Sequence, residues 1–167
     1  MIEHTSDVES LVAQVAERLL AYGQWLATAE SCTGGLIAKL LTDRAGSSAW
    51  FERGLVSYSN AAKQALLGVP AAIIDTQGAV SEATVRAMAQ GLRAHAPVQW
   101  GIAVTGIAGP GGGSMDKPVG TVWLAWIDPQ HHVTAVCRHY AGDRNAVRQQ
   151  TARDALAGLL ERLDAAG

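Results

Sequence analysis

The alternation of apolar strand-like segments with helical segments over the first hundred residues is the feature that most constrains the fold of this chain. Strands are expected at residues 25–29, 54–58, 100–104, 119–127 and 133–140. Helix-bearing segments separate the first three strands, as parallel neighbours require. A glycine-rich loop and a four-residue turn join the last three, which favours antiparallel pairing. We therefore expect an α/β fold with a mixed five-stranded sheet, helices on both faces, and a fourth strand that runs against the others.

Helical spacing of apolar side chains predicts the remaining elements. Helices are expected at residues 8–20, 35–42, 63–67, 85–92 and 145–163. Ser6 and Glu9 have the spacing of a capping box for the first helix, and Ser81 can cap the fourth. No repeat, linker or low-complexity tract divides the sequence, so residues 1–167 are expected to form one domain.

Charge and cysteine content exclude several classes of protein. The net charge is −2 and there is no basic run, so a nucleic-acid partner is not expected. Two cysteines, Cys32 and Cys137, are too few for a disulfide scaffold and fit a reducing compartment. The sequence shows neither a signal peptide nor an apolar run that could cross a bilayer. We expect a cytoplasmic protein with no membrane partner.

Four unusual segments follow the expected strands that run parallel. The sequence AESCTGG occupies residues 29–35, and Tyr-Ser-Asn occupies residues 58–60. Thr-Gly at 105–106 and Gly-Asp-Arg at 142–144 follow the third and fifth strands. Because open α/β sheets bind ligands at the carboxyl ends of their strands, these segments predict one shared site.

Ser31 is the preferred nucleophile, since a strand-to-helix turn holds its hydroxyl at the rim of the sheet. The alternative is that Ser31 and Thr33 only cap the following helix. Catalysis by serine needs a base, and none of the five histidines is well placed to serve as one. A Ser-His-Asp triad is therefore weakly supported.

Lysine is the other possible base, and the chain has only Lys39, Lys63 and Lys117. Lys63 follows the end of the second strand, where desolvation would favour its neutral form. Tyr58 could relay the proton of Ser31 or help to hold this lysine. The alternative for each residue is an ordinary surface side chain.

Cys32 is adjacent to the preferred nucleophile. A cysteine at a helix N-terminus can be a thiolate nucleophile, but free cysteines more often behave as small buried hydrophobic residues. We expect Cys32 to lie in the core.

The second glycine-rich segment, residues 105–113, lacks the closing Gly-Lys-Ser/Thr of a phosphate-binding P-loop and leads into a strand. Its glycines allow backbone to approach a phosphate or a ring closely, although a flexible connection is the alternative. Arg144, at the start of the last helix, suits a phosphate, and an exposed arginine is the alternative there.

Taken together, five motifs resemble the CinA C-terminal domain family in their order along nearly the whole chain. They are AESCTGG at 29–35, GLVSYSN at 54–60 followed by Lys63, GAVS at 78–81, the loop at 105–113, and KPVGTV at 117–122. The resemblance implies a three-layer α/β/α sandwich with strand order 2-1-3-4-5 and the fourth strand antiparallel. It also implies hydrolysis of the carboxamide of nicotinamide mononucleotide to nicotinate mononucleotide and ammonia.

The family's serine, tyrosine and lysine correspond to Ser31, Tyr58 and Lys63, which are the expected catalytic residues. The expected substrate-binding residues are Thr33, Gly34, Gly35, Asn60, Thr105, Gly106, Gly109 and Arg144. No cofactor or metal is expected. Longer family members carry an N-terminal domain, and the pyrophosphatase activity associated with it is not expected here.

Two other functions remain open from the sequence: a regulatory module that binds a nucleotide without converting it, and an amidase for another small carboxamide. A homodimer or higher homo-oligomer is expected, with Trp50 and Trp126 as exposed residues available for self-association.

Overall fold

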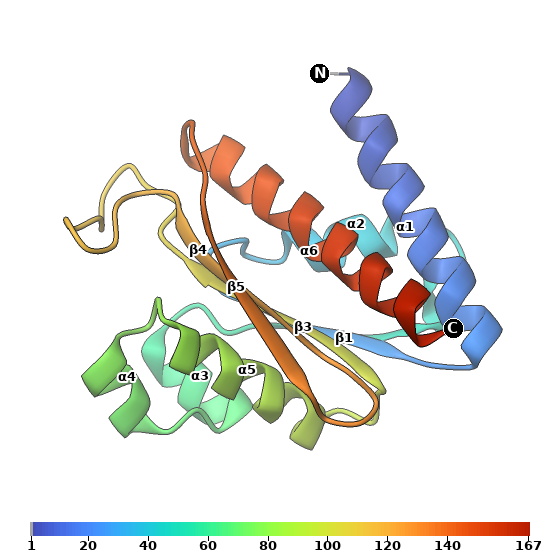
Figure 1. The fold of residues 1–167 in the computed structure, drawn as a ribbon, viewed down its shortest axis with the longest axis horizontal. Coiled ribbons are helices and arrows are strands. Elements are labelled where there is room, and N and C mark those ends of the chain that lie inside the picture. Colours follow the sequence, from blue (N-terminus) through green and yellow to red (C-terminus); the bar gives the residue numbers. More distant parts are fainter. Residues whose placement is uncertain (1) are drawn as a thin grey trace.

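A five-stranded sheet lies between two layers of helices in the computed structural model, which describes residues 2–167 and the side chains from residue 7 onward (Figure 1). The strands are β1 (Leu26–Glu30), β2 (Phe51–Val56), β3 (Trp100–Gly106), β4 (Thr121–Ile127) and β5 (Val133–His139). Their order is β2-β1-β3-β4-β5; β1 is parallel to β2 and β3, and β4 is antiparallel to β3 and β5. The predicted sandwich, strand order and antiparallel fourth strand are confirmed.

Each face of the sheet carries its own helices and its own apolar core (Figure 1). The first layer contains α1 (Ile2–Tyr22), α2 (Leu36–Thr42) and α6 (Arg144–Ala166); the second contains α3 (Asn60–Leu67), α4 (Ala71–Gln77) and α5 (Glu82–His95). Alternation along the strands explains the division, since Ile102 and Val104 face the first layer while Ala103 faces the second. The second face is lined by small residues of the central strands, namely Ala27, Ala29, Ala103 and Ala125.

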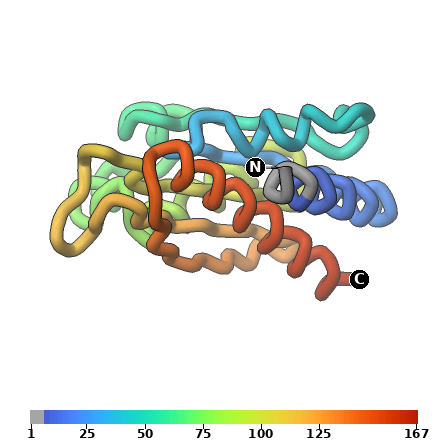
Figure 2. Tube along the Cα trace, turned by 90° about the horizontal axis from the view of Figure 1, so that it is seen from above, coloured from blue at the N-terminus to red at the C-terminus, as the bar shows by residue number. Residues whose placement is uncertain are grey.

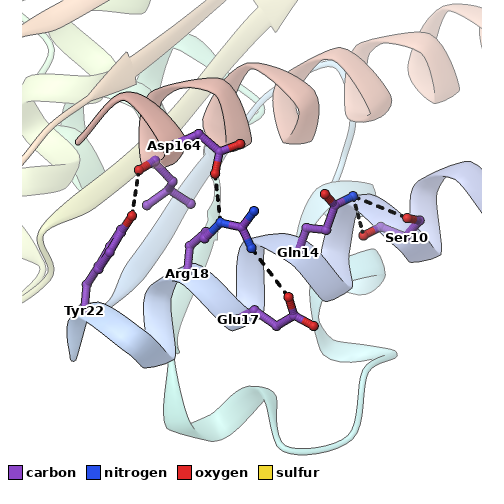
Figure 3. Close-up of polar contacts among 7 residues, drawn as sticks. Ser10, Gln14, Glu17, Arg18, Tyr22 and Asp164 are labelled. Atoms are coloured by element: carbon purple, nitrogen blue, oxygen red, sulfur yellow. Dashed lines mark hydrogen bonds and ion pairs between the residues drawn. The ribbon is translucent and has the colours of Figure 1, made fainter. Parts of the chain in front are cut away.

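The two longest helices, α1 and α6, pack against each other (Figure 2). Val15, Leu19 and Leu163 are fully buried in the same apolar core, and burial of such side chains contributes about 1.5–3 kcal/mol each. At the edge of this contact, Arg18 Nε lies 2.8 Å from Asp164 Oδ1, and the Tyr22 hydroxyl donates to the Leu163 carbonyl over 3.0 Å (Figure 3). The apolar contact supplies the stability, because the Arg18–Asp164 pair is solvent-exposed.

Several element boundaries differ from those predicted. α1 begins at Ile2, so Ser6 lies within the helix rather than before it, and its side chain is outside the described residues. β2 covers Phe51–Val56 instead of residues 54–58, because its first half is an edge segment with charged residues and no continuous apolar run. The helix α4 was not predicted; Pro70 precedes it and Gly78 ends it with a positive φ.

The expectation that Trp50 and Trp126 are exposed was wrong. They are 1% and 4% exposed, and both belong to the apolar core. The Trp126 indole donates to the Ala155 carbonyl, and the Arg162 guanidinium lies 4.0 Å from the centre of its ring. Trp126 stabilises the packing of α6 on the sheet, and neither buried tryptophan offers a surface for self-association.

Among residues 2–167, no helix has both the length and the apolar character that a membrane span requires.

One edge of the sheet collects the loops that follow β1, β2, β3 and β5 (Figure 1). The helix α3, which begins at this edge, is held against α5 by a close approach at Gly91. A Cβ atom at Gly91 would lie 1.7 Å from the Leu67 carbonyl oxygen, so a larger residue would push the two helices apart. The position of α3 therefore depends on α5 as well as on its own loop.

Candidate active site

A cleft with a volume of about 270 Å³ opens at this edge of the sheet. Its walls come from the four segments that the sequence placed together. The predicted site residues that line it are Ser31, Tyr58, Asn60, Lys63, Thr105, Gly106, Gly109 and Arg144. The other residues that line it are Cys32, Ala79, Val80, Ile107, Ala108, Gly111 and Gly112.

Lys63 and Ser31 meet at the inner end of the cleft. Lys63 Nζ lies 3.0 Å from Ser31 Oγ, although 32 residues separate them in the sequence. The same nitrogen donates to the main-chain carbonyls of Ser57, at 3.1 Å, and Tyr58, at 3.0 Å. Ser59 caps α3 by accepting from the Ala62 amide, which fixes the first turn of the helix that carries Lys63. The amine is thus held by its own helix and by the end of β2.

Burial changes the chemistry of this lysine. Lys63 is 1% exposed and Ser31 is 7% exposed. Desolvation lowers the pKa of Lys63 below its ordinary value of 10.5, because burial penalises the ammonium form. No carboxylate pairs with Nζ among its hydrogen-bond partners in the described structure, and its two carbonyl contacts can be made by a neutral amine. This arrangement favours a lysine that can accept a proton.

Glu30 shapes the turn that carries Ser31, a role that was not predicted from the sequence. Its carboxylate is 1% exposed and accepts from the amides of Ile37, at 2.9 Å, and Ala38, at 3.0 Å. The Thr33 hydroxyl donates to the same carboxylate over 2.6 Å. Glu30 therefore satisfies the N-terminus of α2 from inside the fold, and neither Ser31 nor Thr33 caps this helix. An acidic residue shortly before a helix is the signal that could have indicated this role.

Thr33, Gly34 and Gly35, which were predicted to bind substrate, do not line the cleft. The Thr33 side chain is buried against Glu30, and the Gly34 amide donates to the Ser31 carbonyl over 3.0 Å. Gly35 has a φ of 100° at the start of α2, where a glycine is strongly favoured. In this structure the three residues build the turn behind Ser31 instead of contacting the space in front of it.

Cys32 is buried, as expected, with 5% of its surface exposed. Desolvation raises the pKa of its thiol to about 12. A thiol with so high a pKa is protonated near neutral pH and is a poor nucleophile. This result favours Ser31 over Cys32 for that role.

Tyr58 and Arg144 form the outer rim of the cleft. Tyr58 is 57% exposed, and its hydroxyl accepts from Arg144 Nη2 over 3.0 Å. Arg144 Nη1 donates to the Gly109 carbonyl over 2.8 Å. The phenol of Tyr58 is therefore directed to the rim, while its main-chain carbonyl contacts Lys63.

The glycine-rich loop forms the opposite wall. The Thr105 hydroxyl donates to the Ala79 carbonyl over 2.8 Å, which ties the end of β3 to the segment before α5. At Gly106 a Cβ atom would lie 2.6 Å from Val122 Cγ2 and 2.9 Å from the Thr121 carbonyl oxygen. Gly106 is thus required by the close approach of β4. Asn60, the first residue of α3, is exposed and faces the cleft.

A second cavity of about 500 Å³ adjoins the cleft and shares Arg144 and Ala108 with it. Arg148, one helical turn after Arg144, also lines this cavity, and its Nη2 donates to the Thr33 carbonyl over 2.9 Å. No motif in the sequence had indicated a role for Arg148. Its spacing of four residues from Arg144 places both on one face of α6, which was the available signal.

The other candidate bases lie elsewhere. Lys39 is exposed and pairs with Asp43, and Lys117 donates to the Gln77 carbonyl at the end of α4. Among the described residues that line the cleft there is no histidine. No group of three or more histidine, cysteine, aspartate or glutamate side chains suited to a metal was found in the described part of the chain.

Comparison with known sequences gives one consistent family. A profile of the CinA C-terminal domain matches residues 8–163. The chain is 49% identical over 154 residues to the nicotinamide-nucleotide amidohydrolase PncC of Pseudomonas putida, which covers 92% of this chain and 96% of that protein. It is 54% identical over 142 residues to a CinA-like protein of Anaeromyxobacter dehalogenans, but this match covers 85% of the chain and only 35% of the relative. The chain therefore spans about a third of that longer relative.

Comparison with solved structures supports the same fold. The crystal structure of the competence damage-inducible protein A (ComA) from Klebsiella pneumoniae superposes with a TM-score of 0.91 at 41% sequence identity. The match covers 94% of this chain and 97% of that one.

Proposed function

Because the chain belongs to the CinA C-terminal domain family, we propose that it is an amidohydrolase that converts nicotinamide mononucleotide and water to nicotinate mononucleotide and ammonia. Relatives that match nearly their full length carry the name nicotinamide-nucleotide amidohydrolase. The observation that carries the proposal is the 3.0 Å contact between Lys63 Nζ and Ser31 Oγ inside the cleft. A buried amine next to a hydroxyl is the arrangement that serine–lysine acyl transfer requires.

The first step is proton transfer from Ser31 to Lys63. A neutral amine has two N–H donors and one lone pair, and the carbonyls of Ser57 and Tyr58 occupy the donors. The lone pair then faces Ser31 and accepts its hydroxyl proton directly. Ser31 Oγ attacks the carboxamide carbon, and a tetrahedral intermediate forms. The positive pyridinium ring withdraws electrons from that carbon and makes it more electrophilic.

The second half of the reaction releases ammonia and then the acid. Lys63, now an ammonium, donates its proton to the leaving amide nitrogen as the C–N bond breaks. Water, deprotonated by the neutral amine, attacks the acyl-enzyme, and the Lys63 ammonium returns that proton to Ser31 Oγ as the acyl–oxygen bond breaks. Nicotinate mononucleotide leaves and the serine hydroxyl is restored.

Stabilisation of the oxyanion is assigned to the turn after Ser31. The Gly34 amide already donates to the Ser31 carbonyl, and the amides of Ile37 and Ala38 donate to the Glu30 carboxylate. We propose the Cys32 amide, which belongs to the residue after Ser31 and lines the cleft, as an oxyanion donor. Loss of one such donor typically costs about 2.7–4 kcal/mol of barrier.

Arg144 is proposed to bind the 5′-phosphate, with Asn60, Thr105, Gly106 and Gly109 contacting the rest of the nucleotide. Arg144 lies at the boundary between the cleft and the second cavity, where a phosphate attached to a ribose in the cleft would emerge. A guanidinium binds phosphate with two parallel hydrogen bonds, which favours arginine at this place.

We also propose a cytoplasmic location and a homodimer or higher homo-oligomer, with residues 1–167 acting as one domain and needing no cofactor. The negative formal charge and absence of a basic run support the proposal that nucleic acid is not a partner. Sedimentation analysis of the purified chain tests the oligomeric state.

The decisive experiment is a coupled ammonia assay with nicotinamide mononucleotide. Wild type releases ammonia, and Ser31→Ala lowers kcat by about 10⁴-fold or more, because the nucleophile is lost. Ser10→Ala, an exposed position on α1, is the matched control and retains wild-type turnover. Retained turnover in Ser31→Ala would remove Ser31 from the mechanism.

The same assay separates the alternatives. Calorimetric binding of the nucleotide without ammonia release would instead identify a regulatory module. Ammonia release from another small carboxamide, but not from nicotinamide mononucleotide, would identify a different amidase.

A further inference from the structure

Tyr58 contacts two parts of the site with two different groups. Its main-chain carbonyl accepts from Lys63 Nζ over 3.0 Å, at the inner end of the cleft. Its hydroxyl accepts from Arg144 Nη2 over 3.0 Å, at the rim. The side chain is 57% exposed, so little packing fixes the phenol apart from this bond. The family resemblance places Tyr58 with the catalytic residues without saying which of these groups acts.

Arg144 is fixed from two sides. Nη1 donates to the Gly109 carbonyl over 2.8 Å, while Nη2 donates to the Tyr58 hydroxyl. An exposed arginine samples many rotamers, and ordering it on binding costs free energy. Two acceptors, one on the glycine-rich loop and one on Tyr58, hold the guanidinium before substrate arrives. Its remaining N–H groups stay available for an anion, since a guanidinium has five.

Proton relay through the phenol is unnecessary in this geometry. Lys63 Nζ contacts Ser31 Oγ directly, and the Tyr58 hydroxyl is engaged with a cation at the rim. A tyrosine hydroxyl that accepts a hydrogen bond from arginine holds the guanidinium in place. This role differs from that of a proton relay.

We propose that the Tyr58 hydroxyl is a positioning group that orients Arg144 toward the substrate phosphate, and that Tyr58 acts in catalysis only through its main-chain carbonyl. This inference rests on the proposed nucleotide amidase activity. It makes Tyr58 a determinant of selectivity for the phosphorylated substrate over its nucleoside.

The test is Tyr58→Phe, assayed for ammonia release from nicotinamide mononucleotide and from nicotinamide riboside. The phenyl ring and the main-chain carbonyl remain, and only the hydroxyl is lost. We expect KM for the mononucleotide to rise roughly three- to tenfold, the effect of losing one hydrogen bond. We expect kcat to change less than about twofold with the mononucleotide, and kcat/KM for the riboside, which has no phosphate, to change equally little. Tyr22→Phe, which removes a hydroxyl at the α1–α6 contact, is the matched control.

A double-mutant cycle shows whether Tyr58 works through Arg144. In an Arg144→Ala background, Tyr58→Phe is expected to have no further effect on KM for the mononucleotide, because the group that it orients is gone. Additive effects of the two substitutions would overturn the inference. A collapse of kcat in Tyr58→Phe with both substrates would also overturn it and would establish the phenol as a proton relay.

Failure of the proposed function looks different. If wild type releases no ammonia from nicotinamide mononucleotide, the amidase assignment itself is wrong. If wild type is active but Arg144→Ala affects both substrates equally, phosphate recognition at Arg144 is wrong. That second outcome would also overturn the positioning role of the Tyr58 hydroxyl, whereas the Tyr58→Phe results test that role with phosphate recognition by Arg144 intact.

Discussion

The inner end of the cleft and its outer rim each contain a hydrogen-bonded pair, and the two pairs differ in burial. Lys63 and Ser31 are 1% and 7% exposed, whereas Tyr58 is 57% exposed and Arg144 is exposed as well. Both pairs have donor–acceptor distances of 3.0 Å. Distance alone therefore does not distinguish a reacting pair from a binding pair.

Burial produces the difference. At the inner end, desolvation lowers the pKa of Lys63 and makes a proton acceptor available. At the rim, water and salt screen the guanidinium, which remains charged and can be reached by a ligand. The molecule thus places proton transfer where water is excluded and anion recognition where water is present.

The largest effect that tests this comparison is expected for Lys63→Met. Methionine fills a similar volume without an ionisable group, so kcat is expected to fall about 10²- to 10⁴-fold in the ammonia assay. Stability is expected to be equal or higher in urea unfolding, because a buried amine is replaced by an apolar group. Lys39→Met, which removes an exposed lysine, is the control and retains wild-type kcat. A Lys63→Met enzyme with normal turnover would show that the buried lysine is not the base.

Changing pH gives the next largest effect. The neutral amine is the active form, so kcat/KM is expected to fall about tenfold per pH unit below the lowered pKa of Lys63 and to level off above it. The free energy of unfolding is also expected to depend on pH. Between the lowered pKa of Lys63 and about 10.5, the unfolded chain carries a proton on this lysine that the folded chain lacks, so stability rises with pH over this range. Urea unfolding at several pH values measures this slope. Lys63→Met should remove the contribution of this residue, and an unchanged slope would contradict the assigned shift.

Salt gives the smallest effect and separates the two ends of the cleft. Raising the salt concentration from about 0.05 M to 0.5 M is expected to raise KM for nicotinamide mononucleotide a few-fold, since an exposed arginine–phosphate contact is screened. The kcat value should change less than about twofold, because the buried pair is shielded from ions. KM for nicotinamide riboside is the control and should not respond. Equal responses of both substrates would show that the rim does not recognise the phosphate.

The sheet was predictable because its signals are local. Apolar runs identified the central strands, and the lengths of their connections decided which pairs are parallel. Secondary structure was less predictable in segments where apolar and polar residues are mixed. The edge strand β2 begins with Phe-Glu-Arg, and the short helix α4 has no side-chain cap, so the start of β2 and the presence of α4 were not clear from the sequence.

The cleft was predictable in its location and less so in its details. Ser31, Lys63 and Arg144 were all placed at one edge, and the structure brings them to the same cleft. Glu30 and Arg148 were missed, because a buried carboxylate and a half-buried arginine look like ordinary surface residues in a sequence. Thr33, Gly34 and Gly35 were expected to face substrate, but their hydrogen bonds point back into the turn.

The sequence by itself determined the order of the strands and of the helices other than α4, the scarcity of lysine, and the segments that meet at one edge of the sheet. These follow from side-chain periodicity and from how the chain must cross between parallel strands. Only the tertiary structure decided that Lys63 is buried against Ser31 and that the Tyr58 phenol turns toward Arg144. Proximity and desolvation depend on side chains from distant parts of the chain, and no local pattern encodes which of them exclude water.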